Sequence, residues 1–218
     1  MSPFPGRRAA ALAVLLATAS CSSMYYGMME SFGVEKRHIM VDRVEEARDD
    51  QEDAKEQFKT TLERFKELTG ADGGDLESTY NALAKDYERC VDDADAVRDR
   101  IESIEDVAED MFDEWRTEID EISNVDYRRT SEDLLDDTRQ RYAKMIAAMK
   151  DAEAKMAPVL QAFKDQVLFL KHNLNAQFIA QLQNTVLQIE GDVDVLIADM
   201  ERSIQEADEF IEGMNAST

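Results

Sequence analysis

A regular alternation of apolar and charged positions runs along the chain from Leu76 to Trp115. Apolar or small residues recur there in alternating steps of four and three, and acidic or basic residues fill most positions between them. An average step of 3.5 residues keeps one row of side chains, a seam, facing a partner helix, as in a coiled coil. A helix of this length is roughly 60 Å long at about 1.5 Å per residue, so it needs other helices to cover its seam. The seam comprises Leu76, Tyr80, Leu83, Tyr87, Cys90, Ala94, Val97, Ile101, Ile104, Ala108, Met111 and Trp115.

The same spacing recurs in three further segments. Gly70, Gly73 and Gly74 separate the first segment from the second, and the pattern lapses again between Ser123 and Asp126. Glycines end helices and short linkers return the chain antiparallel, so the segments are expected to pack on one another. We predict an all-α protein, an elongated antiparallel helical bundle or coiled coil of three or four long helices. The predicted helices are 34–69, 75–123, 130–171 and 174–213.

Two positions decide between three helices and four. Pro158 lies inside the third segment, where a proline costs about 3 kcal/mol, so it predicts a kink or the first turn of a new helix. A break around His172 to Asn175 would give four helices. Without that break, the last two segments would form one long kinked helix.

The N-terminal segment has the character of an export signal. Arg7 and Arg8 precede an uncharged run, residues 9–20, rich in Ala, Leu and Val, which ends at Cys21. This run is too short to span a bilayer as a helix and has the layout of a secretory signal peptide. We therefore expect residues 1–20 to be removed.

Residues 16–21 resemble the bacterial lipobox, in which the cysteine is diacylated and becomes the new N-terminus. Thr18 departs from the aliphatic residue that is usual at its position. The resemblance implies lipidation of Cys21 and, because Ser22 follows it, transfer to the periplasmic face of the outer membrane of a Gram-negative bacterium. The alternative is ordinary cleavage near Ala19, which would leave a free cysteine.

Residues 21–33 would then form a short lipid-anchored tether. This segment is rich in Met, Tyr and Phe, which either rest among lipid headgroups or pack against the end of the bundle. The membrane, reached through the N-terminal lipid, is thus the first expected partner.

Charge excludes one class of partner. The 218 residues include 48 acidic and 25 basic ones, for a net charge of −23, and loss of Arg7 and Arg8 would make the charge more negative. Each nucleic-acid phosphate needs a compensating cation, so no nucleic-acid partner is expected. The charge suits a soluble body or a basic partner.

One window breaks the charged pattern. Residues 172–189 contain no Asp, Glu, Lys or Arg, although one residue in three of the chain is charged. Amides are less costly to bury than charges, so we expect this window to be covered on more than one face. Burial within the bundle, an oligomer or protein-partner surface, and a ligand groove all stay open. The candidate interaction residues are His172, Asn173, Asn175, Gln177, Gln181 and Asn184.

Candidate chemistry is sparse. The two histidines, His38 and His172, lack neighbours at metal-ligand spacing, so we expect neither a metal site nor a cofactor, and we identify no catalytic residue. The acidic cluster within residues 92–95 lacks the glycine turn of a calcium loop and is expected to be a solvated outer face. Cys90 lies on the seam, either as a buried thiol or as an intermolecular disulfide.

Two blocks carry a family resemblance. Residues 36–49, KRHIMVDRVEEARD, and residues 169–177, FLKHNLNAQ, resemble recurrent blocks of a family of proteobacterial lipoproteins, family 2959 of the domains of unknown function. The resemblance agrees with the lipobox and implies no activity. We expect a non-enzymatic cell-envelope lipoprotein that acts as a coiled-coil scaffold, spacer or protein-interaction module. The alternative is a periplasmic ligand-binding or envelope-stress factor that uses residues 172–189.

Overall fold

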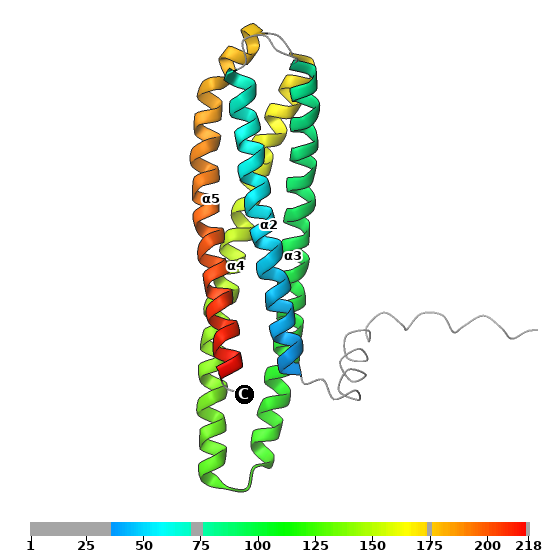
Figure 1. Ribbon diagram of the computed structural model, residues 1–218. Helices are drawn as coiled ribbons and strands as arrows, with labels where there is room; N and C mark the ends of the chain where they lie inside the picture. The colour runs from blue at the N-terminus through cyan, green and yellow to red at the C-terminus, as the bar shows by residue number, and fades with distance from the viewer. Residues whose placement is uncertain (1–35, 71–75, 174–175, 217–218) are drawn as a thin grey trace, which may run out of the picture. The chain divides into compact units, whose positions relative to one another are not determined.

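The part of the chain that the structure describes is a bundle of four long helices (Figure 1). The structure, a computed structural model, describes residues 36–70, 76–173 and 176–216, and these residues contain no strand. From Arg37 onward the chain forms one compact unit. The predicted all-α bundle is confirmed, with four helices rather than three. The helices are α2 (Lys36–Gly70), α3 (Leu76–Glu121), α4 (Val125–His172) and α5 (Ala176–Ala216).

Ion pairs between the helices show that sequence neighbours run antiparallel and that the last helix returns to the first. Arg48 of α2 lies 3.2 Å from Asp208 of α5, whereas Lys66, near the other end of α2, lies 2.8 Å from Glu190. The numbers rise along α2 as they fall along α5, so these two helices are antiparallel and in a fixed register. Contacts of Lys144 and Lys155 of α4 fix the register of α5 on its other side.

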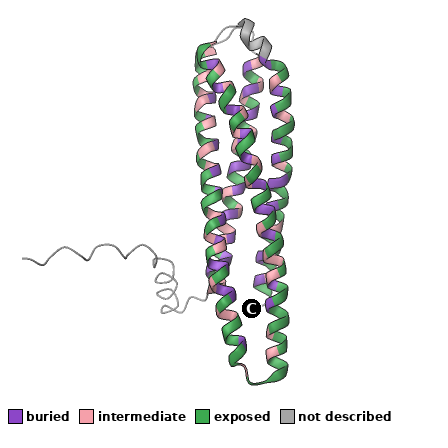
Figure 2. Ribbon diagram, turned by 180° about the vertical axis from the view of Figure 1, so that it is seen from behind, coloured by how far each residue is buried: buried purple, intermediate pink, exposed green. Residues whose placement is uncertain are grey.

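The core consists of large apolar side chains from all four helices. Phe58 and Phe65 of α2 stack on Phe163 of α4, with ring centroids 6.0 and 5.3 Å apart, and join these two helices through the centre. Buried positions face inward along each helix and exposed ones face outward (Figure 2). Each such side chain contributes about 1.5–3 kcal/mol when removed from water. Other fully buried large residues are Met40, Leu68, Leu83, Ile104, Met145, Met149, Met156, Leu170 and Phe210.

Helix α4 begins five residues before the predicted start at residue 130. The side-chain oxygen of Asn124 accepts hydrogen bonds from the backbone N–H groups of Asp126 and Tyr127, at 3.0 and 3.1 Å, and so caps the helix. The predicted start at residue 130 was wrong because the first turn of α4 contributes no buried apolar residue to the seam. Val125 and Tyr127 are 75% and 70% exposed.

Pro158 does not end the helix, since α4 continues through it to His172. The ring of Pro158 removes the N–H group that would bond the carbonyl of Ala154. Both residues are exposed, so water can hydrate that carbonyl. The break predicted around His172 is confirmed. The predicted signal peptide, residues 1–20, and tether, residues 21–33, lie outside the described residues.

The α3–α4 hairpin extends past the start of α2 and the end of α5 (Figure 1). The guanidinium carbon of Arg37, in the first turn of α2, lies 5.9 Å from the centre of the Trp115 ring. At the end of α5, a Cβ added to Gly213 would collide with the guanidinium of Arg141. The tip of the hairpin, beyond Trp115 and beyond the end of α5 at Ala216, is therefore a two-helix extension.

Two polar side chains in the core lack partners. Gln51 of α2 and Ser203 of α5 are fully buried, and no hydrogen bond reaches the Oε1 and Nε2 atoms of Gln51 or the Oγ atom of Ser203. The register of α2 against α5 places the two residues within about one turn of each other. A buried polar group without a partner costs about 1–3 kcal/mol, so this layer is a weak point of the core.

Gln51→Leu is expected to raise the free energy of unfolding by about 1–3 kcal/mol, because it removes unpaired buried polar atoms. The matched control is Gln57→Leu on the same helix. Gln57 Nε2 donates to Thr61 Oγ1 at 3.2 Å and to the carbonyl of Asp86 at 3.3 Å, so its loss should cost about 1 kcal/mol. Urea titrations followed by circular dichroism measure both changes. A loss of stability in both variants would show that Gln51 has a partner in solution.

Candidate functional site

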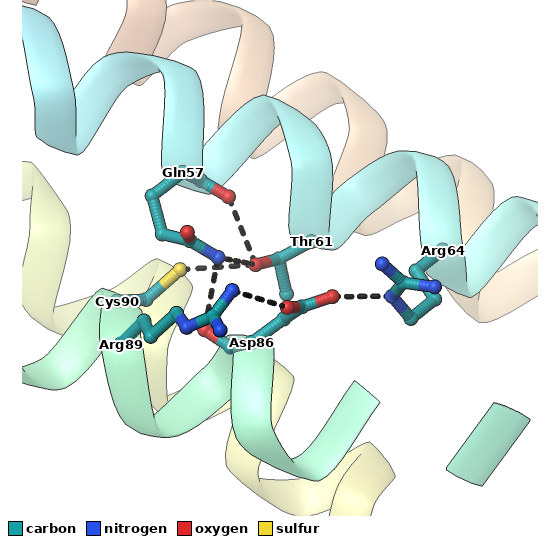
Figure 3. Close-up of polar contacts among 6 residues, drawn as sticks. All are labelled: Gln57, Thr61, Arg64, Asp86, Arg89 and Cys90. Carbon is teal, nitrogen blue, oxygen red and sulfur yellow. Dashed lines mark hydrogen bonds and ion pairs between the residues drawn. The ribbon is translucent and has the colours of Figure 1, made fainter. Parts of the chain in front are cut away.

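A polar cluster lies between α2 and α3 in the second half of α2 (Figure 3). Helix α2 contributes residues three or four apart and α3 does the same, so all of them face the interface of the two helices. We call this group the Cys90 cluster. It consists of Gln57, Thr61 and Arg64 of α2 and Asp86, Arg89 and Cys90 of α3.

The thiol of Cys90 is held by a chain of hydrogen bonds. Thr61 Oγ1 donates to the backbone carbonyl of Gln57 at 2.9 Å and lies 3.1 Å from the Cys90 sulfur, so the S–H group donates to Thr61. Cys90 is a free cysteine and fully buried, and burial raises the pKa of its thiol to about 12. The thiol is therefore protonated and unreactive at physiological pH. The predicted buried thiol is confirmed.

Asp86 supplies a buried carboxylate beside this thiol. It is 3% exposed and forms an ion pair with Arg64 Nε of α2, while Arg89 Nη1 lies 3.5 Å from its other oxygen. Two guanidinium groups thus compensate one desolvated charge, and the pair with Arg64 ties α2 to α3. The cluster offers a neutral thiol and a paired carboxylate, an arrangement suited to joining helices.

The acidic residues at 92–95 form no metal site in the described part of the chain, where no group of three or more His, Cys, Asp or Glu side chains is placed to hold an ion. The negative charge of Asp93 is nevertheless unfavourable in the folded protein. Partial burial raises the pKa of its carboxyl, and the negative charges of Asp53, Asp92 and Asp50 raise it further. Like charges therefore crowd this side of the α2–α3 interface.

The predicted interaction residues that the structure describes lie on different helices, His172 and Asn173 at the end of α4 and Asn184 on α5. His172 is exposed at the end of α4, whereas Asn173 ends that helix: its backbone N–H donates to Leu170 O at 3.1 Å and its side chain to Phe169 O at 2.9 Å. Asn184 is exposed on α5. Asn175, and the side chains of Gln177 and Gln181, lie outside the described residues.

The bundle itself does not cover residues 172–189 on more than one face in their described part, so the first of the three alternatives, burial within the bundle, is wrong there. Between residues 182 and 189, Leu182, Val186 and Ile189 point into the core, and the residues between them are exposed or half-buried. In a four-helix bundle the neighbouring helices cover only the inward side of α5. The uncharged residues on its outward side therefore stay exposed. Leu187, on the outer face, is 64% exposed.

This uncharged outer face continues beyond the window. Uncharged residues recur in steps of one, three or four on the exposed side of α5 as far as residue 198, opposite the buried row. We call this row the α5 stripe. It consists of Asn184, Leu187, Gln188, Gly191, Val195 and Ala198.

The α5 stripe is apolar and open at its centre. Val195 is 52% exposed, and a Cβ added to Gly191 would meet no atom within 4 Å. A partner can therefore approach the helix backbone closely at Gly191. The sequence contains the signal for this stripe, a second three-four spacing of uncharged residues opposite the core. The uncharged window of residues 172–189 predicts only its first part, because the stripe continues to Ala198 between charged residues.

Asp93→Asn is expected to raise the melting temperature at pH 7, because it removes a carboxylate whose ionisation the folded state disfavours. The folded pKa is raised, so the cost is present at neutral pH and disappears as Asp93 becomes protonated; the gain should shrink between pH 7 and about pH 4. Asp99→Asn, an exposed site on the same helix, controls for removal of one negative charge. Calorimetry across this range measures both, and a gain that persists unchanged at pH 4 would contradict the expectation.

Comparisons with known proteins identify one family. None of the described helices is long and apolar enough to cross a membrane. No curated protein and no solved structure matches the chain. A family model described as "Protein of unknown function (DUF2959)" matches residues 25–214, which include all of α2, α3 and α4 and nearly all of α5. This match covers most of the chain and agrees with the resemblance in the two sequence blocks, so the protein belongs to the DUF2959 family.

Proposed function

We propose that this protein is a non-enzymatic, lipid-anchored scaffold that presents the α5 stripe to a protein partner at the periplasmic face of the outer membrane. The observation that carries the proposal is the exposure of an uncharged, partly apolar row on a strongly acidic bundle. Covering Leu187 and Val195 releases bound water and desolvates no charge, whereas the remaining surface would require many charges to be desolvated.

The anchor is supported by the sequence before the bundle. Arg7 and Arg8, the uncharged run and Cys21 have the order of a lipoprotein signal. Each buried methylene of an acyl chain contributes about 0.8 kcal/mol, so two or more chains hold a protein firmly on a bilayer. A tether of about a dozen residues would keep the bundle close to the membrane surface.

A binding role also suits the polar groups of the bundle. The Cys90 thiol is protonated and buried, and the Asp86 carboxylate is paired with two guanidinium groups, so both serve to join helices. The α5 stripe lies on the outward side of a helix. Such a surface suits a protein partner better than the enclosed groove that the ligand-binding alternative requires.

Cys21→Ala is expected to abolish both palmitate labelling and the sensitivity of processing to globomycin, because the acylated sulfur atom is removed. Cys90→Ala is the matched control, since its thiol is buried and should leave labelling unchanged. Metabolic labelling and membrane fractionation in a Gram-negative host measure the effect. Labelling that survives Cys21→Ala would disprove lipidation at this residue.

A photo-crosslinking residue at position 187 is expected to join the protein to a specific partner in cells, because Leu187 is 64% exposed in the proposed surface. Position 125 is the matched control, because Val125 is similarly exposed, at 75%, but lies at the tip of the α3–α4 hairpin. Immunoblots should show a discrete adduct from position 187 only. Equal adducts from both positions, or none from position 187, would count against the proposed function.

A further inference from the structure

The α5 stripe is bordered on one side by acidic residues that face α2. Glu190 lies 2.8 Å from Lys66 of α2, so this side of α5 borders α2. Asp194 is four residues further along, on the same side, and is exposed. The border toward α2 therefore presents the exposed carboxylate of Asp194, next to a Glu190 carboxylate that Lys66 already pairs.

The other border carries one exposed carboxylate. Asp199 is buried and ion-paired with Lys155 of α4 and with Arg202, so it shows that this side of α5 borders α4. Asp192 precedes Asp199 by seven residues, or two turns, and is exposed on the same side. The uncharged row thus runs between Asp192 on one side and Glu190 and Asp194 on the other, and it ends before Arg202.

We propose, building on the proposed function, that the partner of the α5 stripe is an amphipathic helix of another protein, with small or aliphatic residues along its seam and Lys or Arg on both borders. Helices pair in this way when apolar seams meet and charges beside the seams are opposite. Gly191 lets the partner backbone come close, and Leu187 and Val195 supply the apolar area.

A second copy of this chain fits the same surface poorly. Pairing of two α5 stripes would place the carboxylates at Asp192 and Asp194 against the acidic borders of the other copy. The net charge of −23 would add repulsion between the two molecules. Charge thus favours a basic partner over self-association.

The test uses the full-length protein in detergent and three synthetic peptides. The first is an amphipathic helix of about four heptads, long enough to cover the stripe. It has a seam of Leu and Ala and carries Lys on both borders. The second carries Glu in place of every Lys. The third has the composition of the first in scrambled order, so that it keeps the charge and loses the amphipathic face. Fluorescence anisotropy measures binding, and light scattering reports the mass of the protein alone.

The Lys-bordered helix is expected to bind, and the Glu-bordered and scrambled peptides are expected to bind far more weakly. Val195→Glu should weaken binding about tenfold or more, because it places a charge in the seam. A purely electrostatic attraction would instead strengthen when the protein gains a negative charge, so the sign of this change separates the two mechanisms. Val125→Glu, at the hairpin tip, is the matched control and should leave the affinity of the Lys-bordered helix within about twofold.

Gly191→Gln provides a variant that separates binding from folding. Replacing a helical glycine stabilises a helix by about 0.5–1 kcal/mol, while the added side chain blocks close approach. Gly191→Gln should therefore bind the Lys-bordered helix more weakly than the unmodified protein does and should have a higher melting temperature.

Four results would overturn the inferred partner chemistry. They are no binding of the Lys-bordered helix, equal binding of the scrambled peptide, unchanged or tighter binding by Val195→Glu, and a stable dimer that Val195→Glu dissociates. If crosslinking at position 187 in cells still yields an adduct, the scaffold function stands and only the basic helical partner is excluded. If that crosslinking fails as well, the proposed function fails with it.

Discussion

Mutual burial of the apolar seams holds this protein together. No helix of 35 to 48 residues can hide its own seam, so each depends on two neighbours, and α2 also meets α4 through Phe58, Phe65 and Phe163. The seams consist mainly of Leu, Ile, Val, Met, Phe and Ala, which pack without polar partners. The rest of the surface is consequently free to carry charge.

Charge then specifies register more than it adds stability. Exposed ion pairs contribute only about 0.2–1 kcal/mol each, yet those of Arg48, Lys66 and Lys144 link particular levels of neighbouring helices. The buried pair of Arg64 with Asp86 differs because the carboxylate is desolvated and a misplaced register would leave it unpaired. Asp199 of α5 is likewise buried and paired with Lys155 of α4, so a shifted register would leave buried carboxylates without their partners.

The proposed surface follows from the same division between core and solvent. Polar groups that face inward, such as Thr61 and Cys90, are used to join helices, whereas the α5 stripe faces outward with no helix of the bundle over it. An acidic bundle that leaves one row uncharged retains a place where another helix can bind without desolvating carboxylates. The acidic borders then select the charge of that helix.

The sequence by itself determined an all-α bundle of long helices, because a three-four spacing of apolar residues is buried only when such helices pack together. It left three or four helices open, and the break between His172 and Ala176 decided for four. The sequence also showed the uncharged window around residue 184. It did not determine where α4 begins, since the cap at Asn124 depends on local hydrogen bonds and not on the seam. Nor could it decide which sides of α5 are covered. That depends on how many neighbours a helix has in three dimensions, and in a four-helix bundle the outer face of α5 keeps Leu187 and Val195 in contact with water.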